Sequence, residues 1–274
     1  MKKIVLSLIA FPVCQTLIGQ AFNAEKERSS LNYSGRRAQV IQKFKNVKAG
    51  NFGEFIPGIM TRMVTSKKIV ALTFDACGGP RGSEFDTALI AFLKKEKIPA
   101  TLFVAGSWIE KNTSLFKLLC EETLFEIENH GLSHRPCSLT GKRKYGIAGT
   151  QNSGEVFDEI ELNARQIEFY SKRKPQFYRP AAAAADEGCV SMAKELEEKV
   201  VNFDVLSGDA VQGTGAGQIA KNIIDNTGPG SIIIMHMNQP KRKGFEALEQ
   251  VVPELRKQGY EFVKLEGHPL VGKK

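Results

Sequence analysis

Residues 69–75 of the chain read IVALTFD, a short apolar run that ends in a carboxylate, Asp75. The β-branched and aromatic residues in this run are typical of a β-strand. Six further strand-like runs follow at residues 101–104, 124–127, 176–178, 200–206, 231–235 and 261–265.

Between these runs, apolar residues recur at helical spacing. Phe85, Leu89 and Phe92 fall on one face of a helix. Similar patterns occur around residues 114–120, 157–167, 190–196, 219–224 and 248–255. Strands that alternate with helices predict a parallel sheet. With about seven strands, we expect an α/β fold in which the sheet closes into an incomplete (β/α) barrel.

The composition is that of an ordinary globular protein. Of 274 residues, 42% are hydrophobic and 25% are charged, which excludes a disordered, collagen-like or coiled-coil chain. Five cysteines are too few for a disulfide scaffold, and none are spaced as CxxC. A zinc cluster made of thiolates alone is therefore not expected.

The first 21 residues are predicted to be an export signal. Lys2 and Lys3 precede an apolar run at residues 4–19, and small residues end at Ala21. The alternative, an anchoring helix, is less favoured because the run is short for a bilayer and Pro12 interrupts it. We expect an exported protein of bacterial type, periplasmic or secreted.

Removal of this segment would leave four cysteines and 36 basic side chains (38 less Lys2 and Lys3) against 30 acidic ones. Four cysteines permit three disulfide connectivities, which the sequence does not separate. Most of the net positive charge lies in residues 22–66, a basic leader that could associate with an anionic wall polymer or membrane surface. The alternative is a solvated surface segment, and export argues against a nucleic-acid partner.

The polar residues expected at the site follow the predicted strands. Parallel strands of a barrel end at one mouth, so these side chains should converge there. Three of the four histidines in the chain are among them. The set comprises Asp75, His130, His134, Arg179, Asp209 and His236.

The same residues lie in motifs that resemble those of the polysaccharide deacetylases, carbohydrate esterase family 4, also called the NodB homology domain. The motifs, in the family's order, are ALTFD at 71–75, IPATLFVAG at 98–106, ENHGLSH at 128–134, FYRP at 177–180 and IMH at 234–236. The resemblance covers about residues 67–266 and implies a deacetylase domain over 67–274 with a distorted barrel. It also implies a metal-dependent hydrolase that removes acetyl groups from N-acetylated sugars of a polymer, peptidoglycan or a chitin-like one.

Two neutral imidazoles four residues apart, His130 and His134, can bind one divalent ion. Zinc is expected, with cobalt, nickel or manganese as alternatives. The resemblance implies that Asp75 is the general base and that Arg179 orients it. It implies that His236 is the general acid.

Asp209 is similar to the aspartate that orients this acid in the family, and Asp204 competes with Asp209 for that role. Family members usually carry a second aspartate after the base, as a metal ligand, but here Ala76 follows Asp75. Water, Asp75 or Cys77 could complete the metal site.

Two further departures from the family pattern concern the sugar site. Residues 181–185 are all alanine, where relatives commonly have proline, an aromatic residue and glycine, and Ala210 stands where they often have tryptophan. We therefore expect a featureless wall there. A catalytically silent polysaccharide-binding protein of the envelope is the alternative to an enzyme, and a hydrolase that uses Cys77 as nucleophile is a more distant one.

Overall fold

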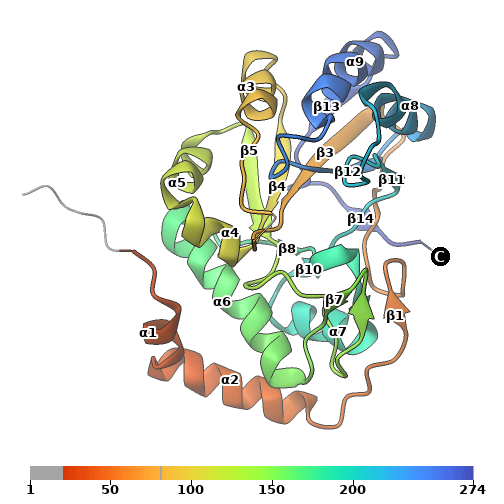
Figure 1. The fold of residues 1–274 in the computed structure, drawn as a ribbon. Coiled ribbons are helices and arrows are strands. Elements are labelled where there is room, and N and C mark those ends of the chain that lie inside the picture. Colours follow the sequence, from red (N-terminus) through yellow and green to blue (C-terminus); the bar gives the residue numbers. More distant parts are fainter. Residues whose placement is uncertain (1–20, 81, 274) are drawn as a thin grey trace, which may run out of the picture.

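The computed structural model describes residues 21–80 and 82–273 (Figure 1). The predicted export signal lies almost wholly outside these residues. Within the described part, no helix is both long enough and apolar enough to cross a membrane.

One parallel sheet forms the centre of the fold. Its path runs β10-β8-β5-β4-β3-β12-β11, and β13 pairs with the beginning of β3 beside β4. All of these pairings are parallel, which confirms the distorted, incomplete (β/α) barrel. The strands are β3 (Ile69–Ala76), β4 (Ala100–Val104), β5 (Phe125–Asn129), β8 (Phe177–Tyr178), β10 (Lys199–Val200), β11 (Val205–Leu206), β12 (Ile232–His236) and β13 (Glu261–Val263).

The prediction of one strand at residues 200–206 was wrong. This segment contains two short strands, β10 and β11, at opposite edges of the sheet. Between them, the carbonyls of Val201 and Asn202 accept N–H groups of Arg179, and the Asn202 side chain donates to the carbonyls of Glu54 and Ala183. The Arg179 side chain thus occupies two backbone carbonyls that a continuous strand would need, and the segment crosses the opening between the two edges of the sheet.

Helices cover the outside of the sheet, and all six predicted helical segments are confirmed. Val70, Leu72 and Phe74 of β3 belong to the core cluster beneath α3, α8 and α9, whereas Ile69 and Ala71 belong to a second cluster inside the barrel. The helices are α3 (Thr87–Lys95), α4 (Gly106–Lys111), α5 (Thr113–Glu121), α6 (Ser153–Ser171), α7 (Glu187–Glu195), α8 (Ala216–Asn226) and α9 (Gly244–Lys257).

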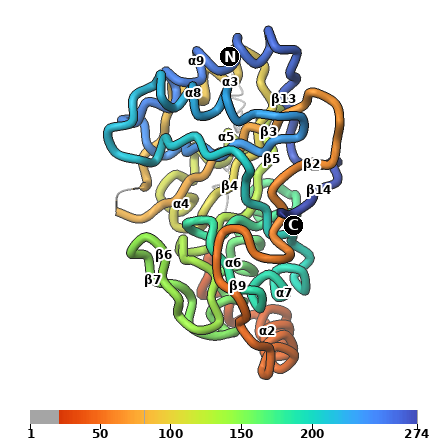
Figure 2. The backbone as a smooth tube through the Cα atoms, turned by 90° about the vertical axis from the view of Figure 1, so that its right-hand side faces the viewer, coloured from red at the N-terminus to blue at the C-terminus, as the bar shows by residue number. Residues whose placement is uncertain are grey.

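The basic leader is folded against the body. It forms α1 (Ala24–Arg28) and α2 (Leu31–Phe44), which lie at the opposite end of the molecule from α8 and α9 (Figures 1 and 2). Tyr33, Val40 and Phe44 of α2 are buried in a cluster with residues of α6 and α7. Arg37 pairs with Asp158 at 2.7 Å. Association of the leader with an anionic surface stays a prediction.

Three small antiparallel sheets complete the chain. β1 (Phe52–Gly53) pairs with β9 (Ala185–Asp186), and β2 (Arg62–Met63) pairs with β14 (Leu270–Val271). The hairpin of β6 (Arg143–Lys144) and β7 (Ile147–Ala148) lies in the long connection between β5 and α6. All four cysteines in the described residues are free thiols.

Candidate active site

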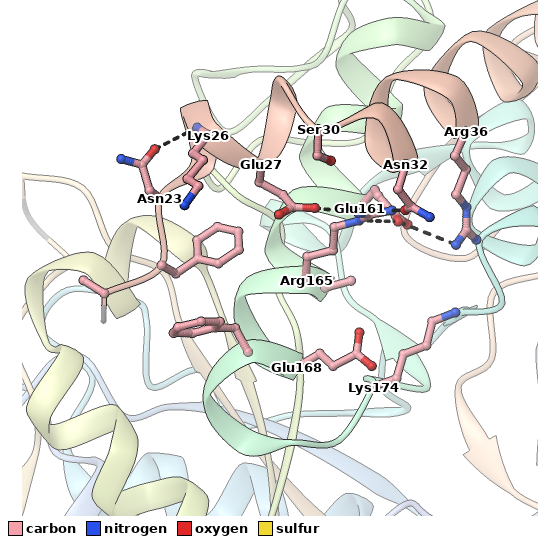
Figure 3. A pocket seen from close by; sticks show the side chains of 14 residues that line it. Asn23, Lys26, Glu27, Ser30, Asn32, Arg36, Glu161, Arg165, Glu168 and Lys174 are labelled. Atoms are coloured by element: carbon pink, nitrogen blue, oxygen red, sulfur yellow. Dashed lines mark hydrogen bonds and ion pairs between the residues drawn. The ribbon is translucent and has the colours of Figure 1, made fainter. Parts of the chain in front are cut away.

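A pocket of about 440 Å³ opens at the C-terminal end of β3. Cys77, His134, Ile147 and Gln239 line it, together with the glycine-rich loop that follows β3. A cavity of about 900 Å³ between α1, α2 and α6 contains none of the predicted site residues (Figure 3). The candidate site therefore lies at the smaller pocket, where Cys77 and His134 are found.

Asp75 and Arg179 form a buried ion pair at this end of the barrel. Arg179 Nη1 donates to Asp75 Oδ1 at 2.8 Å, and two other N–H groups of the guanidinium donate to the carbonyls of Val201 and Asn202. Burial by itself raises the pKa of Asp75, but Arg179 and nearby imidazoles outweigh it and lower the pKa. Asp75 is therefore an ionised carboxylate whose second oxygen, Oδ2, lies 3.6 Å from His130 Nε2.

Two histidines and a cysteine gather beside Asp75. The possible ligand atoms of Cys77, His130 and His134 lie within 4.8 Å of one another. His130 Nε2 is 3.8 Å from Cys77 Sγ, and His130 Nδ1 is 2.6 Å from the carbonyl oxygen of Arg179. Because a carbonyl only accepts hydrogen bonds, Nδ1 carries a proton, and Nε2 is the ring nitrogen that faces the cluster.

The Cys77 side chain lies among imidazoles. Burial by itself raises the pKa of Cys77, but His134, His130 and His236 outweigh it and hold the pKa well below its ordinary value. Ala76, in contrast, is fully buried in the core cluster beneath the helices. Because side chains alternate along a strand, the residue two positions after Asp75, and not the next one, returns to the site.

His236 lies directly beside Asp75, because β12 and β3 pair these two residues in register. Its Nδ1 is 3.0 Å from Asp209 Oδ1, and its backbone N–H donates to Asp209 Oδ2 at 2.7 Å. Burial by itself lowers the pKa of His236, but Asp209 outweighs it and raises the pKa well above its ordinary value. Asp209 therefore favours the protonated form of the imidazole.

Asp204, the competing partner for His236, faces other groups. It accepts the N–H of Ile232 at 2.7 Å and the hydroxyl of Ser231 at 3.0 Å, and it pairs with Arg62 at 2.7 Å. The structure thus brings Asp209 to His236 and leaves Asp204 outside the site.

The run of alanines does not form the expected wall. Ala181, Ala183, Ala184 and Ala185 are buried, and only Ala182 is partly exposed. They form a 3₁₀ turn and the short strand β9 behind the site. The small side chains fit because this segment packs within the core.

Sequence reasoning missed Thr73. Its hydroxyl accepts an N–H of Arg179 at 2.9 Å and donates to the Ile233 carbonyl at 2.7 Å. Thr73 thus joins Arg179 to the sheet on the same face as Asp75. A single hydroxyl inside the otherwise apolar run at residues 69–74 was the available signal.

A (β/α) barrel that places an arginine-bound carboxylate, an aspartate-bound imidazole and a Cys-His-His cluster at one mouth defines a hydrolase-type site. The chain matches the family model described as polysaccharide deacetylase over residues 62–201. It belongs to the polysaccharide deacetylase family, a family of hydrolases.

Similar proteins include a peptidoglycan-N-acetylglucosamine deacetylase of Bacillus cereus, 28% identical over 73% of this chain and 68% of the relative. The structure of the Bc1960 peptidoglycan N-acetylglucosamine deacetylase has a TM-score of 0.66 and 28% identity, over 76% of this chain and 91% of that one. BA3943 of Bacillus anthracis, described as a pseudoenzyme of carbohydrate esterase family 4, has a TM-score of 0.65 and 23% identity, over 77% and 68% of the two chains. This last likeness shows the fold alone.

Proposed function

We propose that the chain is an exported, metal-dependent hydrolase that removes N-acetyl groups from an amino-sugar polymer such as peptidoglycan. One observation carries the proposal: an ionised carboxylate and a protonated imidazole, Asp75 and His236, lie side by side next to three potential metal ligands. Amide hydrolysis needs a base for water, an acid for the departing amine and a group that stabilises negative charge on the carbonyl oxygen.

Cys77, His130 and His134 would hold the metal. A thiolate with two imidazoles is a donor set that suits zinc, and a catalytic zinc site takes three protein ligands and leaves one position open. The orientation of His130 by the Arg179 carbonyl fits this role, because metal-binding histidines usually donate their other N–H to such a group. When bound, the ion supplies Lewis-acid chemistry that polarises a carbonyl and acidifies water.

Asp75 would accept the proton of the attacking water. Arg179 holds one carboxylate oxygen and keeps the group ionised, while Oδ2 lies on the side of His130. The ion pair also fixes the carboxylate, because the guanidinium itself is held by Thr73 and by the segment that crosses the barrel opening. The base is therefore oriented before substrate arrives.

His236 would donate a proton to the nitrogen of the departing amine. Asp209 holds Nδ1 and stabilises the imidazolium, so the other ring nitrogen carries the transferable proton. Expulsion of a neutral amine from the tetrahedral intermediate requires this proton.

Peptidoglycan is the proposed polymer because several of the similar proteins are named as peptidoglycan deacetylases. The predicted export signal would deliver the chain to the envelope, where this polymer lies. The experiment is an acetate-release assay of the chain against purified wall polymer and chitin oligomers, with and without a chelator. Release that the chelator abolishes and zinc restores supports the proposal, whereas no release from any acetylated polymer contradicts it.

A thiol hydrolase is the second candidate, because Cys77 lies among the imidazoles of His130, His134 and His236, and Asp209 orients the last of these. A cysteine, a histidine and an aspartate in this order form a nucleophilic triad. The variants C77D and C77S separate the two candidates. A metal ligand can be replaced by a carboxylate, so C77D keeps chelator-sensitive activity, whereas both substitutions abolish the activity of a thiol nucleophile.

The silent polysaccharide-binding protein remains the alternative to an enzyme. The alanine at position 76 and the alanine run at residues 181–185 favour it, but Cys77 offers a ligand on the site face in place of the second aspartate. A silent protein would bind wall polymer and metal yet release no acetate.

A further inference from the structure

The loop that carries both proposed metal-binding histidines has a strained backbone. Gly131 and His134 adopt φ of +81° and +57°, in the left-handed region. This conformation is unfavourable for a residue with a side chain, because Cβ comes too close to the following carbonyl oxygen. His134 therefore needs contacts that hold the loop in this form.

Glu159 of α6 supplies these contacts. Its Oε1 accepts the N–H groups of Ser133 and Arg135, both at 3.1 Å, and its Oε2 accepts the N–H of Ser133 at 3.2 Å. Its backbone carbonyl accepts the N–H of Leu132 at 2.9 Å. One residue thus holds the backbone on both sides of His134.

Packing alone does not explain why a carboxylate, rather than an apolar side chain, lies at position 159. The residue is 3% exposed, and a buried carboxylate is costly unless hydrogen bonds satisfy it. Its oxygens are used by loop N–H groups, and a Cβ at Gly131 would lie 2.5 Å from Oε1. An apolar side chain would fill the same space on α6 without desolvating a charge, but it would leave the loop N–H groups without an acceptor.

We propose that Glu159 is a positioning residue for the metal site. Its carboxylate fixes residues 131–135 in the form in which His134 faces Cys77 and His130. This inference rests on the proposed function, because the histidine that Glu159 would position is a ligand of the proposed metal site. Residues that orient metal ligands typically change metal affinity 10–100-fold when they are substituted.

The test compares E159Q with E161Q in the full chain after removal of metal. Glutamine at 159 keeps the size and one acceptor oxygen, but it removes the charge and replaces the oxygen that accepts the second contact from the Ser133 N–H with an N–H₂ group, which cannot accept it. Glu161 is a matched control, because it is 3% exposed on the same helix, and its carboxylate pairs with Arg165 at 2.8 Å and Arg36 at 3.6 Å instead of the loop (Figure 3).

Each variant is titrated with Co²⁺, and the absorption of the bound ion is recorded. We expect E159Q to bind Co²⁺ about 10–100-fold more weakly, with an altered d–d spectrum, while E161Q matches the unmodified chain. Thermal unfolding of the metal-free forms measures any general loss of stability, which would affect E161Q as well.

Unchanged affinity and spectrum in E159Q, or equal weakening in E161Q, overturn the inference while the proposed metal site stands. If the unmodified chain binds no Co²⁺, the proposed function fails together with this inference. Should E159Q not fold, the shorter E159D takes its place, and Co²⁺ affinity equal to that of the unmodified chain in that variant overturns the inference.

Discussion

The substitution D209N tests how the proposed acid is charged. Asp209 Oδ1 lies 3.0 Å from His236 Nδ1, and the carboxylate is 4% exposed. Two unit charges at this distance attract by roughly 5 kcal/mol at an effective dielectric constant of about 20. Asparagine keeps the shape of the side chain and one acceptor oxygen but removes this attraction.

The sign of the pH effect follows from the role of His236. A proton donor acts in its protonated form, so activity is present below its pKa and is lost as pH rises through it. Asp209 raises the pKa of His236 and extends activity to higher pH. D209N lowers that pKa, so the alkaline limb of the profile moves to lower pH. Loss of even a third of the attraction reduces the rate on that limb about tenfold or more, since 1.4 kcal/mol is a factor of ten.

The assay is acetate release from acetylated wall polymer, measured from mildly acidic to alkaline pH. D204N is the matched control, because Asp204 is an aspartate just before β11, as Asp209 is one just after it, but Asp204 contacts Ile232, Ser231 and Arg62. We expect D204N to leave the alkaline limb in place. An unchanged limb in D209N, or an equal shift in D204N, would refute the assignment of Asp209.

Three other substitutions test the remaining parts of the site and fold. D75N should reduce turnover about 10²-fold or more with metal retained, because the amide keeps the contact with Arg179 but accepts no proton; near-normal kcat would exclude Asp75 as the base. H130A should lose bound metal in elemental analysis, and a full equivalent of zinc in this variant would contradict the ligand set. F44A should lower the free energy of unfolding by about 3–5 kcal/mol in a denaturant titration, because Phe44 of the leader is buried against α6 and α7, and an unchanged value would show that α2 does not contribute to the core.

The apolar runs and their order were enough to predict the barrel. Each predicted run contributes a strand to the sheet, and the polar residues that follow the runs meet at one mouth because all of the strands in that sheet are parallel. The segment at residues 200–206 shows the limit of this reasoning. An apolar run indicates extended backbone, but contacts distant in sequence, here with Arg179, decide whether that backbone stays in one ladder.

The leader shows a different limit. A count of charges favoured a solvated or surface-binding segment, because such a count does not consider the apolar residues between the charged ones. Tyr33, Val40 and Phe44, seven and four residues apart, share one helical face, and this face enters the core between α6 and α7. The pattern was present in the sequence, but the partner surface was not, since it is assembled from elements more than a hundred residues away.

The proposed ligand set depends on which face of β3 a residue occupies. A comparison of motifs places the missing aspartate at position 76 and suggests a lost function there. The structure places Ala76 among core side chains and Cys77 with the histidines. A carboxylate introduced at 76 in this chain would be buried among apolar groups, where its charge is costly. Restoration of the family's residue at 76 is therefore a poor test of activity here, and the decisive position is the thiol at 77.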